Sequence, residues 1–154
     1  MNVTILYGTE SGNAEMVADD VAVVLGDNGF DATVTAMDEF DVMGLGESNA
    51  SRVLLITSTY GEGGLPATAE PMHAELSEAR PDLTGLEFFA FGLGDSTYET
   101  YNNAVDVLSS MFAGLGARQI GETGRHDAAS GEDPSEIAAE WVRRVLVESV
   151  SAAV

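Results

Sequence analysis

The sequence lacks cysteine and lysine altogether, and both absences limit what the protein can do. Without cysteine there is no disulfide, no thiol redox chemistry and no thiolate metal ligand, so any electron chemistry must come from a bound cofactor. The six basic residues are all arginine, against 26 acidic residues, which gives a formal net charge of −20. Because no basic stripe can displace counterions, we expect no binding to nucleic acid or to an anionic membrane surface.

Long hydrophobic runs are also missing. No segment approaches the roughly 18–20 apolar residues of a membrane-spanning helix, and the N-terminus lacks the basic-then-apolar pattern of a signal peptide. The 154 residues are enough for one domain with its own core. We therefore expect a single domain over residues 1–154, located in the cytoplasm.

The excess of acidic residues has two interpretations. Acidic residues in place of lysine over a whole surface resemble proteins from salt-accumulating halophiles, in which repulsion between like charges weakens the fold at low salt. Alternatively, the acidic residues form a surface that docks on cationic partners. The net charge itself predicts cationic partners.

Apolar runs alternate with segments of helical spacing along the whole chain. The runs at 52–57 and 86–93 are continuous, as expected for strands buried on both faces. We predict strands at 3–7, 31–37, 52–57, 86–93 and 117–122, and helices at 14–25, 39–45, 68–79, 105–115 and from 134 onward. Trp141 should lie in the core, whereas His73 and His126 should face solvent. This α/β alternation predicts a parallel sheet covered on both sides, with ligands at the carboxyl ends of its strands.

The segment after the first predicted strand, Tyr7-Gly8-Thr9-Glu10-Ser11-Gly12-Asn13-Ala14, leads directly into the first predicted helix. The first backbone N–H groups of a helix lack partners, and the helix dipole favours an anion there. Thr9 and Ser11 can add hydroxyl donors, and Gly12 lets the backbone approach a ligand closely. Taken alone, the segment also fits an ordinary strand-to-helix connection with a Ser or Asn cap.

Two further loops place tyrosines at the same predicted edge. Tyr60 follows the third strand between glycines, and Tyr98 and Tyr101 follow the fourth strand. Two tyrosine-bearing loops beside an anion site indicate a planar ligand that carries a phosphate. Each aromatic face contact is worth about 0.5–1.5 kcal/mol beyond the area it buries.

At these three loops the sequence resembles the flavodoxin family, and also the FMN domains of diflavin reductases such as sulfite reductase. The matching motifs are Thr9-Glu10-Ser11-Gly12-Asn13-Ala14, Ser58-Thr59-Tyr60-Gly61-Glu62-Gly63 and Gly92-Leu93-Gly94-Asp95-Ser96-Thr97-Tyr98-Glu99. The resemblance covers essentially the whole chain. It implies a flavodoxin-like three-layer α/β/α sandwich, with a five-stranded parallel sheet of order 2-1-3-4-5 and one non-covalently bound FMN.

The resemblance also assigns roles to individual residues. The phosphate would be bound by Thr9, Glu10, Ser11, Gly12, Asn13 and Ala14. One face and edge of the isoalloxazine would be held by Ser58, Thr59, Tyr60 and Gly61. The pyrimidine edge and the other face would be held by Leu93, Gly94, Asp95 and Tyr98, with Tyr101, Asn102 and Asp127 nearby. Ala14 and Tyr60 stand where many flavodoxins have Thr and Trp, which favours the reductase-like branch.

The function implied is that of a monomeric carrier of single electrons at low potential. Its donor would be a flavin-dependent reductase and its acceptors reductive enzymes, all docking through basic surfaces. No catalytic residue or metal site is expected. An FMN-dependent NAD(P)H:quinone reductase is the first alternative, although no insertion or basic cluster suits a nicotinamide phosphate. A flavin domain of a larger reductase is the second. A signalling receiver domain shares the strand order, but it requires an acidic cluster after the first strand, an acceptor aspartate at the end of the third strand and a lysine after the fifth. Here the third strand ends in Thr57-Ser58, and the sequence has no lysine.

Overall fold

The computed structural model describes residues 2–9, 12–40, 52–58, 65–94, 103–127 and 130–147. Its strands are β1 (Asn2–Gly8), β2 (Asp31–Ala36), β3 (Arg52–Ser58), β4 (Glu87–Gly94), β5 (Arg118–Gln119) and β6 (Gly124–Asp127). Its helical segments are α1 (Asn13–Asp27), the 3-10 turn η1 (Met37–Glu39), α3 (Glu70–Ala79), α4 (Asn103–Gly114), α5 (Pro134–Val142) and the π-helical turn η3 (Arg143–Val147). The helix expected at 39–45 falls mostly outside the described residues.

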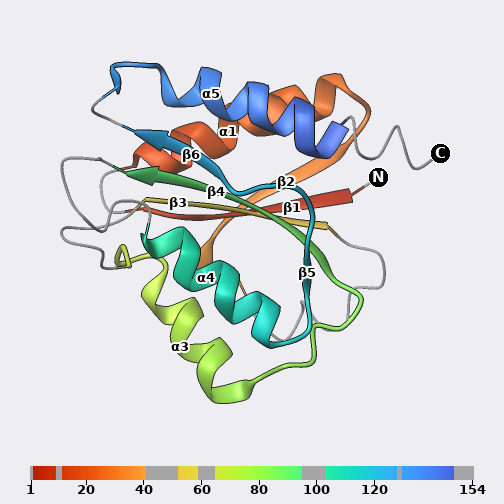
Figure 1. The fold of residues 1–154 in the computed structure, drawn as a ribbon, viewed down its shortest axis with the longest axis vertical. Coiled ribbons are helices and arrows are strands. Elements are labelled where there is room, and N and C mark those ends of the chain that lie inside the picture. Colours follow the sequence, from red (N-terminus) through yellow and green to blue (C-terminus); the bar gives the residue numbers. More distant parts are fainter. Residues whose placement is uncertain are drawn as a thin grey trace.

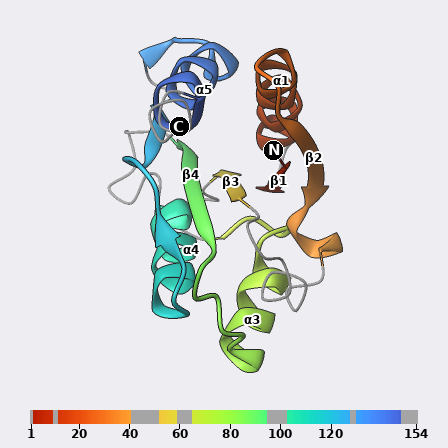
Figure 2. The same ribbon diagram turned by 90° about the vertical axis from the view of Figure 1, so that its right-hand side faces the viewer.

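The strands form one parallel sheet of order β2-β1-β3-β4-β5, with β6 also paired to β4. Helices α1 and α5 cover one face of this sheet, and α3 and α4 cover the other (Figures 1 and 2). The predicted three-layer α/β/α sandwich and its strand order are therefore confirmed. Parallel neighbours require crossover connections, and the helices on both faces supply them.

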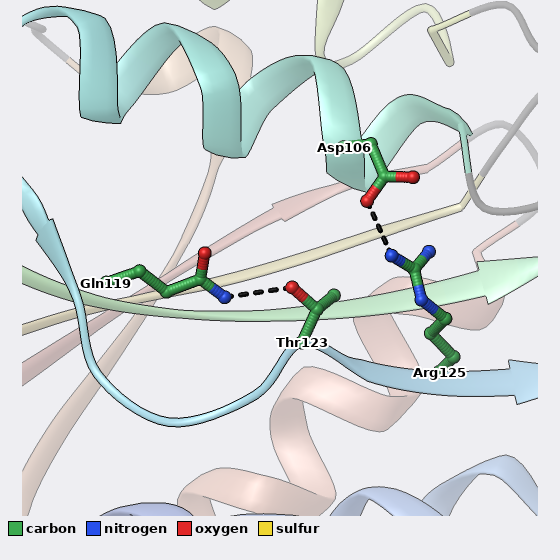
Figure 3. Close-up of polar contacts among 4 residues, drawn as sticks. All are labelled: Asp106, Gln119, Thr123 and Arg125. Atoms are coloured by element: carbon green, nitrogen blue, oxygen red, sulfur yellow. Dashed lines mark hydrogen bonds and ion pairs between the residues drawn. The ribbon is translucent and has the colours of Figure 1, made fainter.

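The last strand differs from the prediction of a single strand at 117–122. Gln119 of β5 pairs with Phe88 of β4, and Gly124 of β6 pairs with Phe91 of β4. The segment between β5 and β6 is therefore two residues longer than the segment of β4 that it runs beside. The extra residues form a bulge, closed by a 2.8 Å hydrogen bond from Gln119 Nε2 to Thr123 Oγ1 (Figure 3). Strand β6 was missed because Gly-Arg-His-Asp has no apolar side chain to mark it.

The core has two halves because side chains on the central strands alternate between the two faces. Ile56 of β3 and Phe91 of β4 pack on the face covered by α1 and α5, where the Phe91 and Trp141 ring centroids lie 5.3 Å apart. Leu55 of β3 and Phe88 of β4 pack on the opposite face, against α3 and α4. The prediction that Trp141 lies in the core is confirmed, since it is only 3% exposed.

Within the described residues, no helix combines the length and apolar character needed to cross a membrane. The same residues contain no group of three or more His, Asp and Glu side chains placed to hold a metal ion.

Candidate functional site at the carboxyl edge of the sheet

The carboxyl ends of four strands meet at one edge of the sheet. β1 ends at Gly8, which lies opposite Thr57, one residue before β3 ends at Ser58. β4 ends at Gly94, which lies opposite Asp127, the end of β6. In Figure 1 the arrowheads of β4 and β6 lie at the same side of the molecule as the beginning of α1. The strand ends are thus small or polar residues beside a helix N-terminus, the place where doubly wound sheets bind ligands.

The turn from β1 into α1 leaves backbone donors without helical partners. Gly12 is the N-cap of α1, with a φ of 93° that suits glycine. The first backbone hydrogen bond of the helix runs from Met16 N to Gly12 O, at 3.1 Å. The N–H groups of Asn13, Ala14 and Glu15 therefore have no acceptor within the helix, and the dipole of the 15-residue helix makes this end attractive to an anion.

Thr9 takes part in two hydrogen bonds, one toward α1 and one toward the segment before α3. Its Oγ1 accepts a hydrogen bond from Gly12 N at 2.8 Å, and its carbonyl oxygen accepts one from Thr68 Oγ1 at 2.9 Å. The Thr9 hydroxyl keeps its own hydrogen available as a donor. In this structure Gly12 N–H is thus engaged within the turn, and the open donors are those that follow it.

Gly8 lies in close contact with the segment that leads into α3. A Cβ at Gly8 would lie 2.8 Å from Ala69 Cβ, 2.9 Å from Thr57 Oγ1 and 3.0 Å from Met37 Sδ. Only a residue without a side chain fits there, so the β1–α1 turn rests directly on the start of α3. The sequence does carry a signal for this contact, because glycine at the end of an apolar strand often marks a close backbone approach.

The charge of the turn is negative. Tyr7 donates a hydrogen bond to Glu15 Oε2 at 2.6 Å. This hydrogen bond, together with partial burial and the negative charge of Glu15, raises the pKa of Tyr7 to about 12. The described residues 7–9 and 12–15 include no arginine. An anion here would therefore be held by backbone N–H groups and hydroxyls rather than by a side-chain cation.

Strand β6 is fastened through the two residues that precede Asp127. Arg125 forms a 2.6 Å ion pair with Asp106 of α4 (Figure 3). A ring nitrogen of His126 lies 2.6 Å from the carbonyl oxygen of Glu132, and His126 is only 7% exposed. The prediction that His126 faces solvent is wrong, because alternation along the missed strand turns Gly124 and His126 inward and Arg125 outward. His73 on α3 is half-buried.

The structure brings about half of the predicted site residues to this edge. Those described are Thr9, Gly12, Asn13, Ala14, Ser58, Leu93, Gly94 and Asp127. The side chains of Ala14 and Leu93 are buried, so only their backbone groups can face a ligand. The other predicted positions lie outside the described residues: Glu10, Ser11, Thr59, Tyr60, Gly61, Asp95, Tyr98, Tyr101 and Asn102.

The sheet and its covering helices place the chain in the class of doubly wound α/β proteins, which bind ligands such as nucleotides and flavins at the carboxyl edge of the sheet. Within this class, the sequence matches the flavodoxin family over residues 5–141, and the chain belongs to that family. The cofactor of this family is FMN.

Individual relatives show the same affiliation. The chain is 34% identical over 142 residues to protein MioC of Escherichia coli O157:H7, covering 92% of this chain and 93% of that protein. It is 35% identical over 153 residues to the sulfite reductase [NADPH] flavoprotein alpha-component of Mannheimia succiniciproducens, covering 99% of this chain but 24% of that protein. A point mutant of flavodoxin from Pseudomonas aeruginosa superposes with a TM-score of 0.83 at 29% identity, covering 99% of this chain and 98% of that one.

The described residues fit FMN. Its phosphate is a dianion that suits the open N–H groups at the start of α1, and the Thr9 hydroxyl can donate to it. Gly12 leaves room for close approach, since no described atom lies within 4 Å of where its Cβ would be. The absence of a basic side chain in the described turn is compatible with this fit because backbone dipoles suffice for phosphate binding.

Proposed function

We propose that this protein is an electron carrier that moves single electrons on one non-covalently bound FMN, held at the carboxyl edge of the sheet. The observation that carries the proposal is the convergence of the β1–α1 turn with Ser58, Gly94 and Asp127 in a member of the flavodoxin family. FMN supplies the one-electron chemistry, and the protein supplies binding, orientation and electrostatics.

Each loop has a separate task in this proposal. The phosphate lies against the N–H groups of Asn13 and Ala14, with the hydroxyl of Thr9 as a further donor. The residues proposed to complete the phosphate site are Glu10, Ser11 and Gly12. Those proposed to hold the ring are Ser58, Thr59, Tyr60, Gly61, Leu93, Gly94, Asp95, Tyr98, Tyr101, Asn102 and Asp127.

The surrounding charge favours low potentials. The protein carries a net charge of −20, and Glu15 lies in the first turn of α1. Negative charges close to a redox centre disfavour the addition of another negative charge. A carrier with such a site gives up its electrons readily to acceptor proteins.

The same charge bears on partners and surroundings. We propose a cytoplasmic monomer, a single domain over 1–154, which docks on basic surfaces of a flavin-dependent reductase and of reductive acceptor enzymes. Three of the six arginines form ion pairs among the described residues, namely Arg52 with Glu87, Arg125 with Asp106 and Arg144 with Glu122. Most of the 26 acidic residues therefore have no arginine to pair with. This imbalance supports adaptation to a high-salt cytoplasm.

Salt dependence tests that adaptation. The Debye length falls from about 30 Å at 0.01 M salt to about 3 Å at 1 M, so repulsion between exposed carboxylates should be largely screened at the upper end of this range. We expect Tm to rise steeply with KCl up to molar concentrations, and more steeply for the apoprotein. A flat response would contradict the halophilic interpretation and leave the acidity as a docking surface.

A second candidate is a flavin domain of a larger reductase. It is favoured by the reductase relatives, whose sequences align with nearly all of this chain over a fraction of their own length. In that case the electron donor would be a domain of the same polypeptide in the natural protein, and the chemistry at the FMN would be the same.

Turnover with NADPH distinguishes a carrier from an enzyme. Purified holoprotein should oxidise NADPH with a quinone only when a separate flavin-dependent reductase is added. Turnover by the chain alone in the usual enzyme range, roughly 1–10³ per second, would contradict the carrier role and favour an NAD(P)H:quinone reductase.

A further inference from the structure

Thr68, which no motif singled out, joins the segment before α3 to the β1–α1 turn. Its hydroxyl donates a 2.9 Å hydrogen bond to the carbonyl oxygen of Thr9, 59 residues earlier in the chain. We propose that Thr68 is a positioning residue for the FMN phosphate, acting through the backbone of Thr9. This inference rests on the proposed FMN site.

The donor sits on a rigid support. Thr68 lies in a turn closed by backbone hydrogen bonds from Ala69 N and Glu70 N to Pro66 O, at 2.9 and 3.2 Å. Pro66 and Ala69 are buried, and Ala69 packs on Gly8, the residue before Thr9. The backbone that carries Thr68 is therefore held by hydrogen bonds and by buried neighbours, so its hydroxyl can fix the carbonyl that it contacts.

The direction of the Thr9 carbonyl matters for an anion. A carbonyl oxygen carries the negative end of the peptide dipole, so it would repel a phosphate if it turned toward the N-terminus of α1. Thr68 satisfies this oxygen on the α3 side of the turn, while Thr9 Oγ1 accepts from Gly12 N at 2.8 Å. The two hydrogen bonds together fix the carbonyl oxygen and the hydroxyl of Thr9 and leave the N–H groups of Asn13, Ala14 and Glu15 open.

A positioning role of this kind has a specific signature. Losing the Thr68 hydroxyl should weaken binding of FMN, which carries the phosphate, but not binding of riboflavin, which has the same ring and no phosphate. A purely structural role would weaken both flavins alike, because the ring loops and the phosphate turn would loosen together.

The test compares flavin binding by apoprotein variants. Thr68→Val removes the hydroxyl and keeps the shape, Thr68→Ser restores the donor, and Thr33→Val is a matched control at an exposed position of the edge strand β2. Fluorescence titrations with FMN and with riboflavin give the two dissociation constants, and thermal melts establish that each variant is folded. If Thr68→Val does not fold, Thr68→Ala removes the same hydroxyl with a smaller side chain.

For Thr68→Val we expect a roughly five- to tenfold weaker affinity for FMN, the size of one neutral hydrogen bond, and riboflavin affinity within about twofold of the wild type. Thr68→Ser and Thr33→Val should bind both flavins like the wild type. Equal weakening toward both flavins, or no weakening toward FMN, would overturn the role of Thr68 alone. A wild-type chain that binds no FMN would overturn both this role and the proposed function.

Discussion

The two ends of the parallel sheet are closed in different ways. At the amino end of β4 and β5, backbone hydrogen bonds run from Leu83 N to Leu115 O and from Arg118 N to Leu86 O, both at 2.9 Å. The Asp82 carboxylate also accepts a hydrogen bond from Thr84 N at 3.0 Å, so this donor too is satisfied within the fold. At the carboxyl end, the β1–α1 turn is held by side-chain hydroxyls, those of Thr9 and Thr68. Its helical N–H groups stay open.

This difference separates stability from ligand binding. The donors and acceptors named at the amino end are paired within the fold, so they contribute to stability and are not available to a ligand. A turn held by hydroxyls is fixed in shape while its backbone donors remain available. Substitutions at the amino end should therefore change stability alone, whereas substitutions at the carboxyl end should change both stability and FMN affinity.

The largest combined effect is expected at Gly8, at the carboxyl end. In Gly8→Ala the new Cβ would meet Ala69 Cβ at 2.8 Å and Thr57 Oγ1 at 2.9 Å, so the turn must shift. We expect a loss of about 1–3 kcal/mol in the free energy of unfolding, from overpacking, and a drop of tenfold or more in FMN affinity. Denaturant unfolding and FMN titration measure the two effects.

Gly26→Ala is the matched control for this substitution. Gly26 lies in α1, and a Cβ there has no described atom within 4 Å. Alanine in a helix should raise stability by up to about 1 kcal/mol. If Gly8→Ala kept its FMN affinity, the contact between the turn and α3 would have no part in binding.

Gly116 lies at the amino end of the sheet, and the same glycine-to-alanine substitution there tests whether this end affects stability alone. Its φ is +106°, and a Cβ would lie 2.8 Å from Thr84 Oγ1 and 3.1 Å from Thr84 N. Gly116→Ala should lower the free energy of unfolding by about 1–3 kcal/mol through backbone strain and overpacking. FMN affinity, measured well below Tm, should not change. A matching loss of FMN affinity would break the distinction between the two ends.

The smallest effect concerns the Tyr7–Glu15 contact. The Tyr7 phenol should ionise near pH 12 rather than near its ordinary pKa of 10.0. The folded state keeps this proton to higher pH than the unfolded state, so the contact stabilises fully below pH ~10 and is lost as pH rises toward ~12. The ultraviolet absorbance of phenolate, followed during an alkaline titration, measures the pH at which Tyr7 ionises.

Tyr7→Phe identifies which phenol titrates late. The variant should lack the late transition and keep the others among the chain's four tyrosines. If the late transition persisted in Tyr7→Phe, the assignment to the Glu15 contact would be wrong.

Much of the fold was predictable because its signals are local. The continuous apolar run of β3 and the helical spacing of α1 each identify their element. The Asp-Pro pair at the start of α5 is a local signal of the same kind, since Asp133 accepts a hydrogen bond from Ser135 N at 2.9 Å. Strand β6 was not predictable in this way, because its inward positions are Gly124 and His126 rather than apolar residues.

The candidate site was predictable only at the level of its loops. Positions at or just after a strand end, such as Ser58 and Thr9, follow from the topology of a parallel sheet, which gathers carboxyl ends at one edge. The support beneath them did not follow, because the Thr68–Thr9 hydrogen bond joins residues far apart in sequence and no local pattern marks its donor. Gly8 carried a local signal for close approach, but its partners depended on the packing of α3.

The most direct test of the central claim is a fluorescence titration of apoprotein with FMN, with riboflavin as the comparison ligand. We expect the fluorescence of added FMN to be quenched until one FMN is bound per chain. FMN should bind more tightly than riboflavin, because the open N–H groups of the β1–α1 turn engage the phosphate of FMN. Absence of quenching, or equal affinity for the two flavins, would contradict an FMN site at this edge of the sheet.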